Sequence, residues 1–445
     1  MKNFSISIKK KINHFNKSIY VEGDKSISHR ALLIASQSHG GISKISGLLE
    51  SEDILNCVKA LRQLGVKIIK KKNEHWIFGN GLGSFRIKNN ATINCGNAGT
   101  LARLIMGCLS SYPIKIKIVG DKSLSKRPME RVIKPLEKFG CRFYPKNKKN
   151  LPIVMQGTNF PAPIKHVEKI GSAQVKSAIQ FAALNTPGIT KIIEVKKSRD
   201  HTENLLKFIG VKIKVNKKKS SNKILIEGQK EFKFFKLNIP GDISSAAFFI
   251  VLTILNKNSK LKIKNINLNP TRAGVLKILT LMKAKISLKN IKNVNGEKRG
   301  DIIVKSSKLV GINCPTSLVP SAIDEFPIIM LAASLAKGVS TFSGLNELEK
   351  KESPRLSVMN SILRQINIKT RLKKDKIKIY GNGDINLKKT YKIKTFGDHR
   401  ICMTAFIMAQ LFGGKFNIKD CNSINTSFPK FLTLMKKIGA HYEIK

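Results

Sequence analysis

Two matching stretches decide the fold, GDKSISHRALLIA at residues 23–35 and GDISSAAFFIVLT at residues 241–253. Each places Gly-Asp and a Ser ahead of a long apolar run, which predicts a buried helix that begins with a polar cap. Four further stretches begin an apolar helix in the same way, with a Gly or a small residue in front: GNAGTLARLIMG (96–107), GSAQVKSAIQFAA (171–183), AIDEFPIIMLAAS (322–334) and GDHRICMTAFIMA (397–409). The starts recur roughly every 70 to 80 residues, which predicts one subdomain used six times.

A second helix follows each start and ends in a common form, usually Leu-rich with a Gly or small residue before a short strand. The six endings are KALRQLGVKI (59–68), KPLEKFGCRF (134–143), NLLKFIGVKI (204–213), LKILTLMKAKI (276–286), NSILRQINIKT (360–370) and LTLMKKIGAHYEI (432–444). Chance similarity among amphipathic helices is the alternative, but six starts and six endings agree in order. The pattern therefore predicts a β-α-β-α-β subdomain in six copies, an α/β (α+β) protein.

A longer period groups these copies into two halves. The segments VEGDKSIS (21–28) and IPGDISSA (239–246) match, so each half of three copies opens with the same element. We therefore expect one domain over residues 22–240. The second begins at residue 241. Together with the resemblance described below, the pattern implies that this domain is discontinuous and combines residues 1–21, including a strand near residues 4–12, with residues 241–445.

Composition excludes several classes of protein. The 445 residues are 42% hydrophobic and 25% charged, which fits folded domains with large cores and not a disordered or collagen-like chain. The longest apolar stretch, about residues 246–255, is too short to span a bilayer. The seven Cys are odd in number and never spaced as CxxC, which favours reduced thiols in the cytoplasm. Residues 1–20 contain no signal-peptide pattern.

The formal net charge of +54 would ordinarily suggest a polyanionic partner. However, only 14 of the 82 basic residues are Arg, and the Lys residues are scattered among abundant Asn and Ile. That mixture is typical of an A+T-rich gene. We expect weak, salt-sensitive adhesion to polyanions, no specific nucleic-acid site and no membrane association. A non-catalytic polyanion-binding protein remains the alternative of another class.

Cations recur beside the predicted helix starts. Lys25, Arg30, Arg103, Lys176 and Arg400 lie in or near first turns, where they oppose the helix dipole unless an anion binds there. The segment 120–132 adds Lys126, Arg127 and Arg131. Several such cations in equivalent repeat positions predict a small polyanionic substrate.

Acidic residues are rare in this chain, and two groups of them stand out. Asp324 and Glu325 lie in an apolar helix start, and Glu347, Glu349 and Glu352 are interleaved with Lys350, Lys351 and Arg355. A carboxylate held near cations stays ionised at neutral pH and can act as a base. A helix-capping role for Asp324 is the structural alternative. Nucleotide-loop motifs and metal-ligand spacings are absent from the sequence.

The same segments resemble a known family. GDKSISHRALL, GNAGTLARL, SLSKRPMERV, GSAQVKSA, SRDHTENLL, NPTRAG, IDEFPI, LEKKESPRLS, GDHR and SFPKF resemble, in order, the motifs of the 5-enolpyruvylshikimate-3-phosphate synthase family. The resemblance runs from about residue 20 to the C-terminus. It implies a two-domain inside-out α/β barrel, each domain being three β-α-β-α-β-β copies around buried helices, with the active site in the cleft between them.

The resemblance also implies a reaction: the enolpyruvyl group of phosphoenolpyruvate passes to the 5-hydroxyl of shikimate 3-phosphate by addition and elimination. It implies a monomer without a metal or organic cofactor. The implied catalytic residues are Asp324, Glu352 and Lys25. Shikimate 3-phosphate would be bound by Lys25, Ser26, Arg30, Ser172, Ala173, Gln174, Arg199, Asp324 and Lys351. Phosphoenolpyruvate would be bound by Lys25, Asn97, Gly99, Arg127, Gln174, Arg355 and Arg400.

Three positions depart from the usual family pattern. Glu22 replaces a Pro, Pro354 replaces an Asp directly before Arg355, and Thr426 occupies the place of a Lys found in some relatives. Gly99 is retained where an Ala in some relatives excludes the inhibitor glyphosate, so sensitivity is expected. The nearest rival is the sister enolpyruvyl transferase that acts on UDP-N-acetylglucosamine. That rival carries Lys-Asn where this chain has Lys25-Ser26, and a reactive Cys in a loop comparable to residues 120–131, which here contains none.

Overall fold

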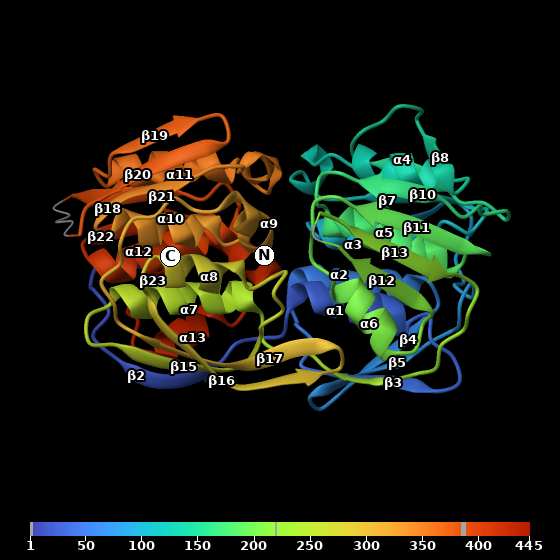
Figure 1. Ribbon diagram of the computed structural model, residues 1–445, viewed down its shortest axis with the longest axis horizontal. Coiled ribbons are helices and arrows are strands. Elements are labelled where there is room, and N and C mark those ends of the chain that lie inside the picture. Colours follow the sequence, from blue (N-terminus) through green and yellow to red (C-terminus); the bar gives the residue numbers. More distant parts are fainter. Residues whose placement is uncertain (1–2, 219, 384–388) are drawn as a thin grey trace. The chain divides into compact units, whose positions relative to one another are not determined.

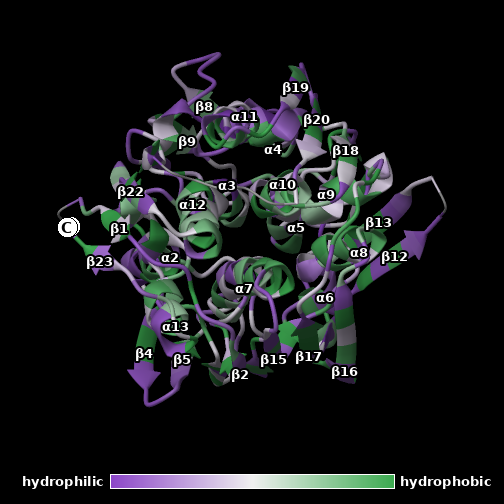
Figure 2. Cartoon of the chain, turned by 90° about the vertical axis from the view of Figure 1, so that its left-hand side faces the viewer, coloured by the Kyte–Doolittle hydropathy of each residue, from purple (hydrophilic) through white to green (hydrophobic). Residues whose placement is uncertain are grey.

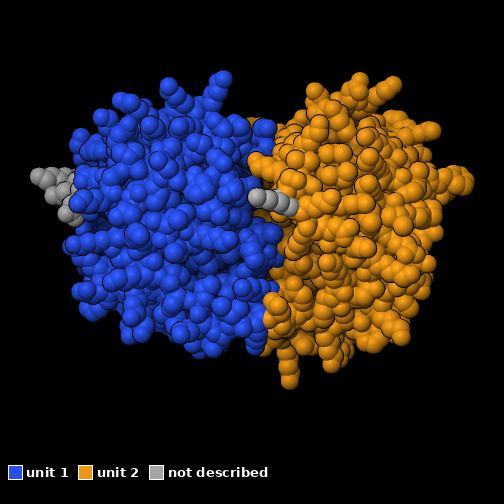
Figure 3. All heavy atoms as spheres, viewed as in Figure 1, with its two compact units in different colours: residues 1–22, 240–292, 298–445 blue, residues 23–239, 293–297 orange. Residues whose placement is uncertain are grey.

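The computed structural model describes residues 3–218, 220–383 and 389–445. The chain forms two compact units, coloured separately in Figure 3. Unit 1 contains residues 1–22, 240–292 and 298–445, and unit 2 contains residues 23–239 and 293–297. Each unit has its own hydrophobic core.

Unit 2 is built around three buried helices, of which α3 contacts both of the others. Their side chains are almost completely buried because the apolar residues cover every face of these helices. Three amphipathic helices follow them in the chain, one after each. The buried helices are α1 (Lys25–Ala35), α3 (Gly99–Cys108) and α5 (Ala173–Leu184), and the amphipathic helices are α2 (Glu52–Gln63), α4 (Glu130–Lys138) and α6 (His201–Phe208).

Unit 1 repeats this arrangement, and its three central helices contact one another. The expected helix at 322–334 is divided, because Pro327 lies in the first turn of the second segment and starts a new helix there. The central helices are α7 (Ile243–Leu255), α10 (Phe326–Ser334) and α12 (His399–Phe412), preceded by the short α9 (Val319–Ala322). The outer helices are α8 (Gly274–Leu281), α11 (Arg355–Gln365) and α13 (Phe431–Lys437).

Three four-stranded sheets surround the helices of unit 2, and all three have one topology. In each sheet the first strand, at one edge, runs parallel to the second. The third strand is antiparallel to the second, and the fourth is antiparallel to the third. The sheets are β14-β3-β5-β4, β6-β7-β9-β8 and β10-β11-β13-β12. Their strands are β3 (Ile42–Ser46), β4 (Lys67–Lys71), β5 (Glu74–Phe78), β6 (Ala91–Asn94), β7 (Lys115–Val119), β8 (Arg142–Tyr144), β9 (Ile153–Gln156), β10 (Lys165–Glu168), β11 (Ile189–Glu194), β12 (Ile213–Lys217), β13 (Asn222–Glu227) and β14 (Lys236–Asn238).

Unit 1 has the same three sheets, β2-β15-β17-β16, β18-β20-β19 and β21-β22-β1-β23. In the second, Val310 and Asn313 supply the parallel edge by isolated bridges to Lys337 and Thr341. The strands are β1 (Ile6–Ile8), β2 (Asn16–Tyr20), β15 (Lys260–Asn267), β16 (Lys285–Val294), β17 (Glu297–Lys305), β18 (Gly338–Phe342), β19 (Thr370–Lys373), β20 (Lys376–Gly381), β21 (Thr390–Lys394), β22 (Lys415–Lys419) and β23 (Glu443–Ile444). Figure 1 labels most of these elements.

The parallel edge strands link the repeats within each unit. The last strand of each copy pairs with the sheet of the next copy, and β14 returns to the first sheet of unit 2. In unit 1 the N-terminal β2 closes the ring by pairing with β15, and β1 completes the sheet that contains β22. The N-terminal segment is therefore the end of the sixth repeat.

Close packing surrounds the Gly of the repeated Gly-Asp motif. A Cβ on Gly23 would lie 1.9 Å from the carbonyl oxygen of Gly47. A Cβ on Gly241 would lie 2.9 Å from side-chain atoms of Val21 and Ile266. Position 23 therefore excludes a larger residue, whereas at position 241 a larger residue would require the side chains of Val21 and Ile266 to shift.

Hydrophobic and hydrophilic residues alternate along many strands, as the banded colours in Figure 2 show, which suits one face on the core and one in solvent. Among the described residues the longest helix, α12, has 14 residues, and no helix has the length and apolarity of a membrane span.

Candidate active site

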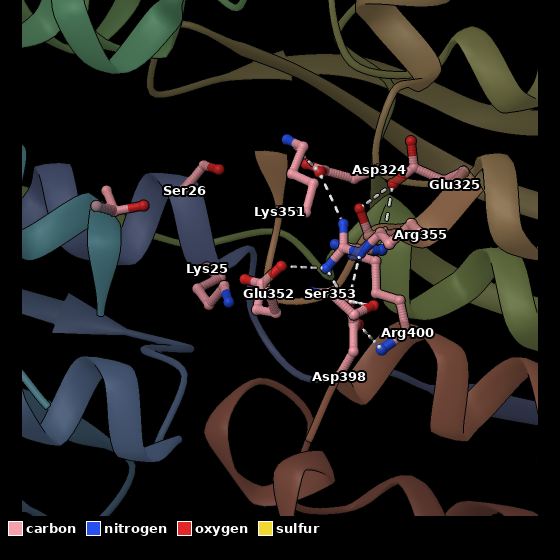
Figure 4. A network of polar contacts seen from close by, with 12 residues as sticks. Lys25, Ser26, Asp324, Glu325, Lys351, Glu352, Ser353, Arg355, Asp398 and Arg400 are labelled. Atoms are coloured by element: carbon pink, nitrogen blue, oxygen red, sulfur yellow. Dashed lines mark hydrogen bonds and ion pairs between the residues drawn. The ribbon is translucent and has the colours of Figure 1, made fainter. Parts of the chain in front are cut away.

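The candidate site residues of unit 1 gather around Arg355, the first residue of α11 (Figure 4). Arg355 is 1% exposed, and its Nε donates to Oδ2 of Asp398 at 2.8 Å. Its Nη2 lies 2.5 Å from Oε2 of Glu352, and its Nη1 lies 3.4 Å from Oδ1 of Asp324. Burial disfavours the charged guanidinium, but the carboxylates of Asp398, Glu352 and Asp324 outweigh it and raise the pKa of Arg355. Arg355 therefore stays charged and fixes three carboxylates.

Asp324 lies between two cations. Besides Arg355, Nζ of Lys351 donates to Oδ1 of Asp324 at 3.0 Å. Asp324 does not cap α10, because the N-cap position belongs to Glu325, which makes no capping bond. The capping alternative is therefore wrong, and the Asp324 carboxylate is directed to Lys351 and Arg355.

Asp398 organises the other side of Arg355. It caps α12 by accepting the backbone N–H of Arg400 at 2.9 Å. Its second oxygen accepts from the backbone N–H and the hydroxyl of Ser353. Pro354 lies at the N-cap position of α11. Although Pro has no backbone N–H, the side chain of Arg355 keeps all the bonds described above. The presence of Pro354 in place of the usual Asp therefore does not disturb the orientation of the Arg355 side chain.

A second buried cluster centres on Glu325 and holds Arg400. Its Oε1 accepts from Nη1 of Arg272 at 3.0 Å and lies 3.5 Å from Nη1 of Arg400. The hydroxyl of Ser244 bonds to both Glu325 and Arg272. Oε2 of Glu325 is buried without a hydrogen-bond partner. Glu325 therefore pairs with two guanidinium groups, and Asp242, 3.5 Å from Nη2 of Arg272, adds a second carboxylate.

In unit 2, Arg30 on α1 is 2% exposed and bonds only to uncharged oxygens among the described residues. It donates to the hydroxyls of Thr202 and Ser177 at 2.7 and 2.8 Å and to the carbonyl of Ser26 at 2.9 Å. Burial and the nearby Arg199 lower the pKa of Arg30 to about 10. Arg199 donates to the Ser26 hydroxyl at 3.4 Å, so two guanidinium groups converge on Ser26.

Lys25 begins α1, one residue after the capping Asp24. Its ammonium group lies 2.9 Å from Oδ2 of Asp53, a residue of α2. The Lys25 side chain is 19% exposed, which leaves it partly open to solvent.

A third group lies at the starts of α3 and α5. Gln174 donates to Thr100 at 2.9 Å and accepts from Arg103 at 3.0 Å. Arg103 also donates to the carbonyl of Gly99. Ser172 caps α5, and Ala173 is its first residue. The sequence-predicted residues Gly99, Ser172, Ala173 and Gln174 are thus brought together.

Arg127 joins this group through Asn97. Its Nη2 donates to Oδ1 of Asn97 at 2.7 Å, and Asn97 in turn donates to Asp121. A Cβ on Gly99 would lie 2.8 Å from Nη1 of Arg103 and 3.2 Å from Nη1 of Arg127. Gly99 therefore allows both guanidinium groups to approach the start of α3.

Lys176 has a different role from the one that its position suggested. It is fully buried, and its Nζ lies 2.7 Å from both Glu194 and Glu203. Burial opposes the charge, but these carboxylates raise the pKa of Lys176. Lys176 is bound to two protein carboxylates and does not serve as a cation for an external anion.

The sequence reasoning missed the contacts that complete these clusters. Glu325, Arg272 and Asp398 lie within the quoted motifs, but their spacing alone does not indicate which carboxylate each cation contacts. Ser177 and Thr202 also lie within quoted motifs but were not singled out, and Asp53 lies in a segment without a distinct motif. Of the other departures, Glu22 accepts the backbone N–H of Lys430 at 2.9 Å, and Thr426 donates to the carbonyl of Ser423. In the described part of the chain, no three His, Cys, Asp or Glu side chains gather as a metal site would require.

Known proteins resemble this chain over nearly its whole length. The family model of EPSP synthase (3-phosphoshikimate 1-carboxyvinyltransferase) matches residues 9–435. The 3-phosphoshikimate 1-carboxyvinyltransferase of Zymomonas mobilis is 41% identical over 441 residues, which cover 98% of this chain and 97% of that protein. The 3-phosphoshikimate 1-carboxyvinyltransferase of Petrotoga mobilis is 40% identical over 428 residues, which cover 96% of this chain and 97% of that protein.

Solved structures agree. The EPSP synthase of Acinetobacter baumannii superposes with a TM-score of 0.86 at 35% identity, covering 99% of this chain and 100% of that one. The enolpyruvyl transferase NikO of Streptomyces tendae, at 12% identity, shares the fold with a TM-score of 0.78 and coverage of 100% and 99%. The expected two-domain α/β fold is thereby confirmed. With one family model over residues 9–435 and relatives of about 40% identity along the whole chain, this protein belongs to the EPSP synthase family.

Proposed function

We propose that the chain transfers the enolpyruvyl group of phosphoenolpyruvate to the 5-hydroxyl of shikimate 3-phosphate, as the names of its relatives indicate. The product is 5-enolpyruvylshikimate 3-phosphate, and inorganic phosphate is released. The reaction is a step of the shikimate pathway, which leads to the aromatic amino acids.

The observation that carries the proposal is the buried Arg30. Its hydrogen bonds go to uncharged oxygens, and Arg199 adds a second positive charge close by. Among the described residues no carboxylate bonds to Arg30, so this buried guanidinium needs a negative partner, which a bound anion would supply. The 3-phosphate or the carboxylate of shikimate 3-phosphate meets this need. Ser26, Ser172 and Ala173 add hydrogen-bond donors.

Phosphoenolpyruvate is assigned to three arginines, of which Arg355 and Arg400 lie in the first turns of α11 and α12. Arg127, Arg355 and Arg400 would bind its carboxylate and phosphate, with Asn97, Gly99 and Gln174 shaping the site in unit 2. Bidentate guanidinium contacts suit both anionic groups and fix their orientation. We propose that the clusters of both units serve this one reaction.

Three residues would move protons in two steps. In the addition, Asp324 accepts the proton of the 5-hydroxyl, the hydroxyl oxygen bonds to C2 of phosphoenolpyruvate, and an acid protonates the methylene carbon. In the elimination, a base removes a proton from the new methyl group, the C2–O bond to phosphate breaks, and the double bond reforms. Glu352 and Lys25 are the proposed acid and base at this carbon, and Lys351 holds Asp324 in place.

Asp324→Asn tests the mechanism. It keeps the shape of the side chain but removes the proton acceptor, so kcat should fall by roughly 10²- to 10⁴-fold. Glu443→Gln, at an exposed surface ion pair, is the matched control and should leave kcat unchanged. An Asp324→Asn variant with undiminished phosphate release would exclude Asp324 as the base.

We further propose that the protein works as a monomer in the cytoplasm. All seven Cys are buried and free, which is typical of a reducing compartment. Gel filtration and cell fractionation test this assignment.

A further inference from the structure

A groove in unit 1 lies apart from the residues assigned to the substrates. It runs between α11 and the edge strand β21 and reaches the end of β22, elements labelled in Figure 1. Its volume is about 460 Å³, within the range of small-molecule pockets. The lining residues are Ser357, Val358, Ser361, Ile362, Gln365, Lys392, Lys394, Phe396 and Lys419.

The groove is positively charged. Lys392 and Lys394 lie on one face of β21, and the strand register places Lys394 beside Lys419. The opposite wall contributes two Ser and one Gln, and none of the nine lining residues is acidic. The nearby carboxylate of Glu349 is held at one end by the backbone N–H and hydroxyl of Ser357, at 2.9 and 3.0 Å. The chemistry of the groove therefore matches an anion with several oxygen acceptors.

An apolar surface accompanies the charge. Val358 and Ile362 are almost fully buried in the wall of the groove, whereas Phe396 is 60% exposed. Phe396 also has a φ of 55°, a left-handed conformation that is unfavourable for a bulky residue. Residues held in such strained conformations cluster at binding and active sites. These features match a ligand that has an aromatic ring beside its anionic group.

Both walls of the groove lead directly to the Arg355 cluster. Helix α11 begins at Arg355, and Phe396 is two residues before Asp398, whose Oδ2 lies 2.8 Å from Nε of Arg355. The turn between them is tied to the groove, because Thr395 donates to the carbonyl of Lys419 at 2.9 Å. The backbone N–H of Asp398 donates to the carbonyl of Thr395. A ligand that shifts Phe396 would thus displace Asp398.

We propose that this groove is a second, regulatory site that binds an aromatic phosphate. The phosphate contacts Lys394 and Lys419, and the ring packs on Phe396. Occupancy changes the affinity of the Arg355 cluster for phosphoenolpyruvate, an effect that rests on the proposed function. By linkage, phosphoenolpyruvate changes the affinity of the groove by the same factor.

Binding is tested by calorimetric titration with phenyl phosphate in the presence of saturating shikimate 3-phosphate, which fills the Arg30 cluster. The double variant Lys394→Gln/Lys419→Gln should weaken the binding about tenfold or more, because two charge-assisted contacts are lost. Lys415→Gln, on β22 but outside the groove, is the matched control and should change Kd less than about twofold. Phe396→Ala should weaken the binding of phenyl phosphate but leave the binding of inorganic phosphate unchanged.

Equal binding by the wild type and the double variant would overturn the site. Equal losses in the control variant would overturn it too, because a general charge effect would then explain the data. Inorganic phosphate binding as tightly as phenyl phosphate would refute the aromatic part of the proposal.

Regulation is tested by titrating phosphoenolpyruvate with and without phenyl phosphate. Its Kd should shift in the wild type and not in the double variant, and an unchanged wild-type Kd would refute the regulatory role. This readout is binding and not turnover. A protein without transferase activity would therefore refute the proposed function and leave both titrations to decide the groove.

Discussion

Glu325 offers the sharpest test of how the unit 1 cluster works. Its Oε1 faces Arg272 at 3.0 Å and Arg400 at 3.5 Å and also bonds to Ser244. The change Glu325→Gln keeps the length of the side chain and one oxygen acceptor but removes the negative charge. Arg400 then loses its carboxylate partner and is no longer held in one orientation.

The magnitude follows from the contacts that weaken. Hydrogen bonds to a charged group contribute about 1.5–3 kcal/mol, against about 0.5–1.5 kcal/mol for neutral ones. The weakened Arg400 contact therefore costs about 1–1.5 kcal/mol. Because about 1.4 kcal/mol corresponds to a factor of ten, the KM of phosphoenolpyruvate should rise about tenfold. The KM of shikimate 3-phosphate, which we assign chiefly to residues of unit 2, should change less than about twofold.

The assay is initial-rate phosphate release with each substrate varied in turn. Glu325→Asp, which keeps the charge, is the control and should restore part of the affinity for phosphoenolpyruvate. Circular dichroism and a urea titration show whether the variants are folded. If both KM values rose equally, or if neither changed in a folded variant, the reasoning about Arg400 would be refuted.

Three further predictions concern other residues. Gly99→Ala places a Cβ 2.8 Å from Arg103 Nη1. The KM of phosphoenolpyruvate should therefore rise about tenfold with kcat little changed, and inhibition by glyphosate should weaken. Unaltered kinetics would contradict this. Lys176→Met strands two buried carboxylates, so urea unfolding should show a loss of about 3–5 kcal/mol, and a loss below about 1 kcal/mol would argue against the ion triad. Burial lowers the pKa of His201, but Glu297, 2.8 Å away, raises it more, and the net shift is upward. The stability that this pair contributes is therefore complete below about pH 6.5 and is lost as the pH rises through the folded pKa. His201→Gln should thus destabilise the protein more at pH 6 than at pH 9 in urea titrations. Equal effects at the two pH values would contradict the assignment.

The six-fold repeat could be predicted because each copy carries its own local signals. A Gly-Asp start, an apolar run and an amphipathic second helix are encoded within a few residues of one another, so they can be read without knowing the fold. The exchange of edge strands could not be predicted. The pairing of β2 with β15 joins segments about 240 residues apart, and no local pattern specifies which parallel neighbour a strand takes.

The candidate site shows the same division. Motifs identified Arg355, Asp324 and Arg30 as chemically important, but not their partners. Asp398 lies 43 residues from Arg355, and Thr202 lies 172 residues from Arg30. These contacts exist only after the helices pack, since each partner is supplied by another repeat.

Lys176 shows where the reasoning from helix starts fails. A cation in a first turn suggests an external anion, because it opposes the helix dipole. Here Glu194 and Glu203 compensate it from β11 and α6. Among the described residues Arg30 has no such carboxylate bond, and this difference was not visible in the sequence. The roles assigned to the individual site residues stay predictions.

The most direct test of the central claim is acceptor specificity. Purified protein is given phosphoenolpyruvate with either shikimate 3-phosphate or UDP-N-acetylglucosamine, and the released phosphate is measured. We predict release with shikimate 3-phosphate, in step with formation of the enol ether, and none with the nucleotide sugar. Release with the nucleotide sugar alone, or no release from folded protein with either acceptor, would contradict the account.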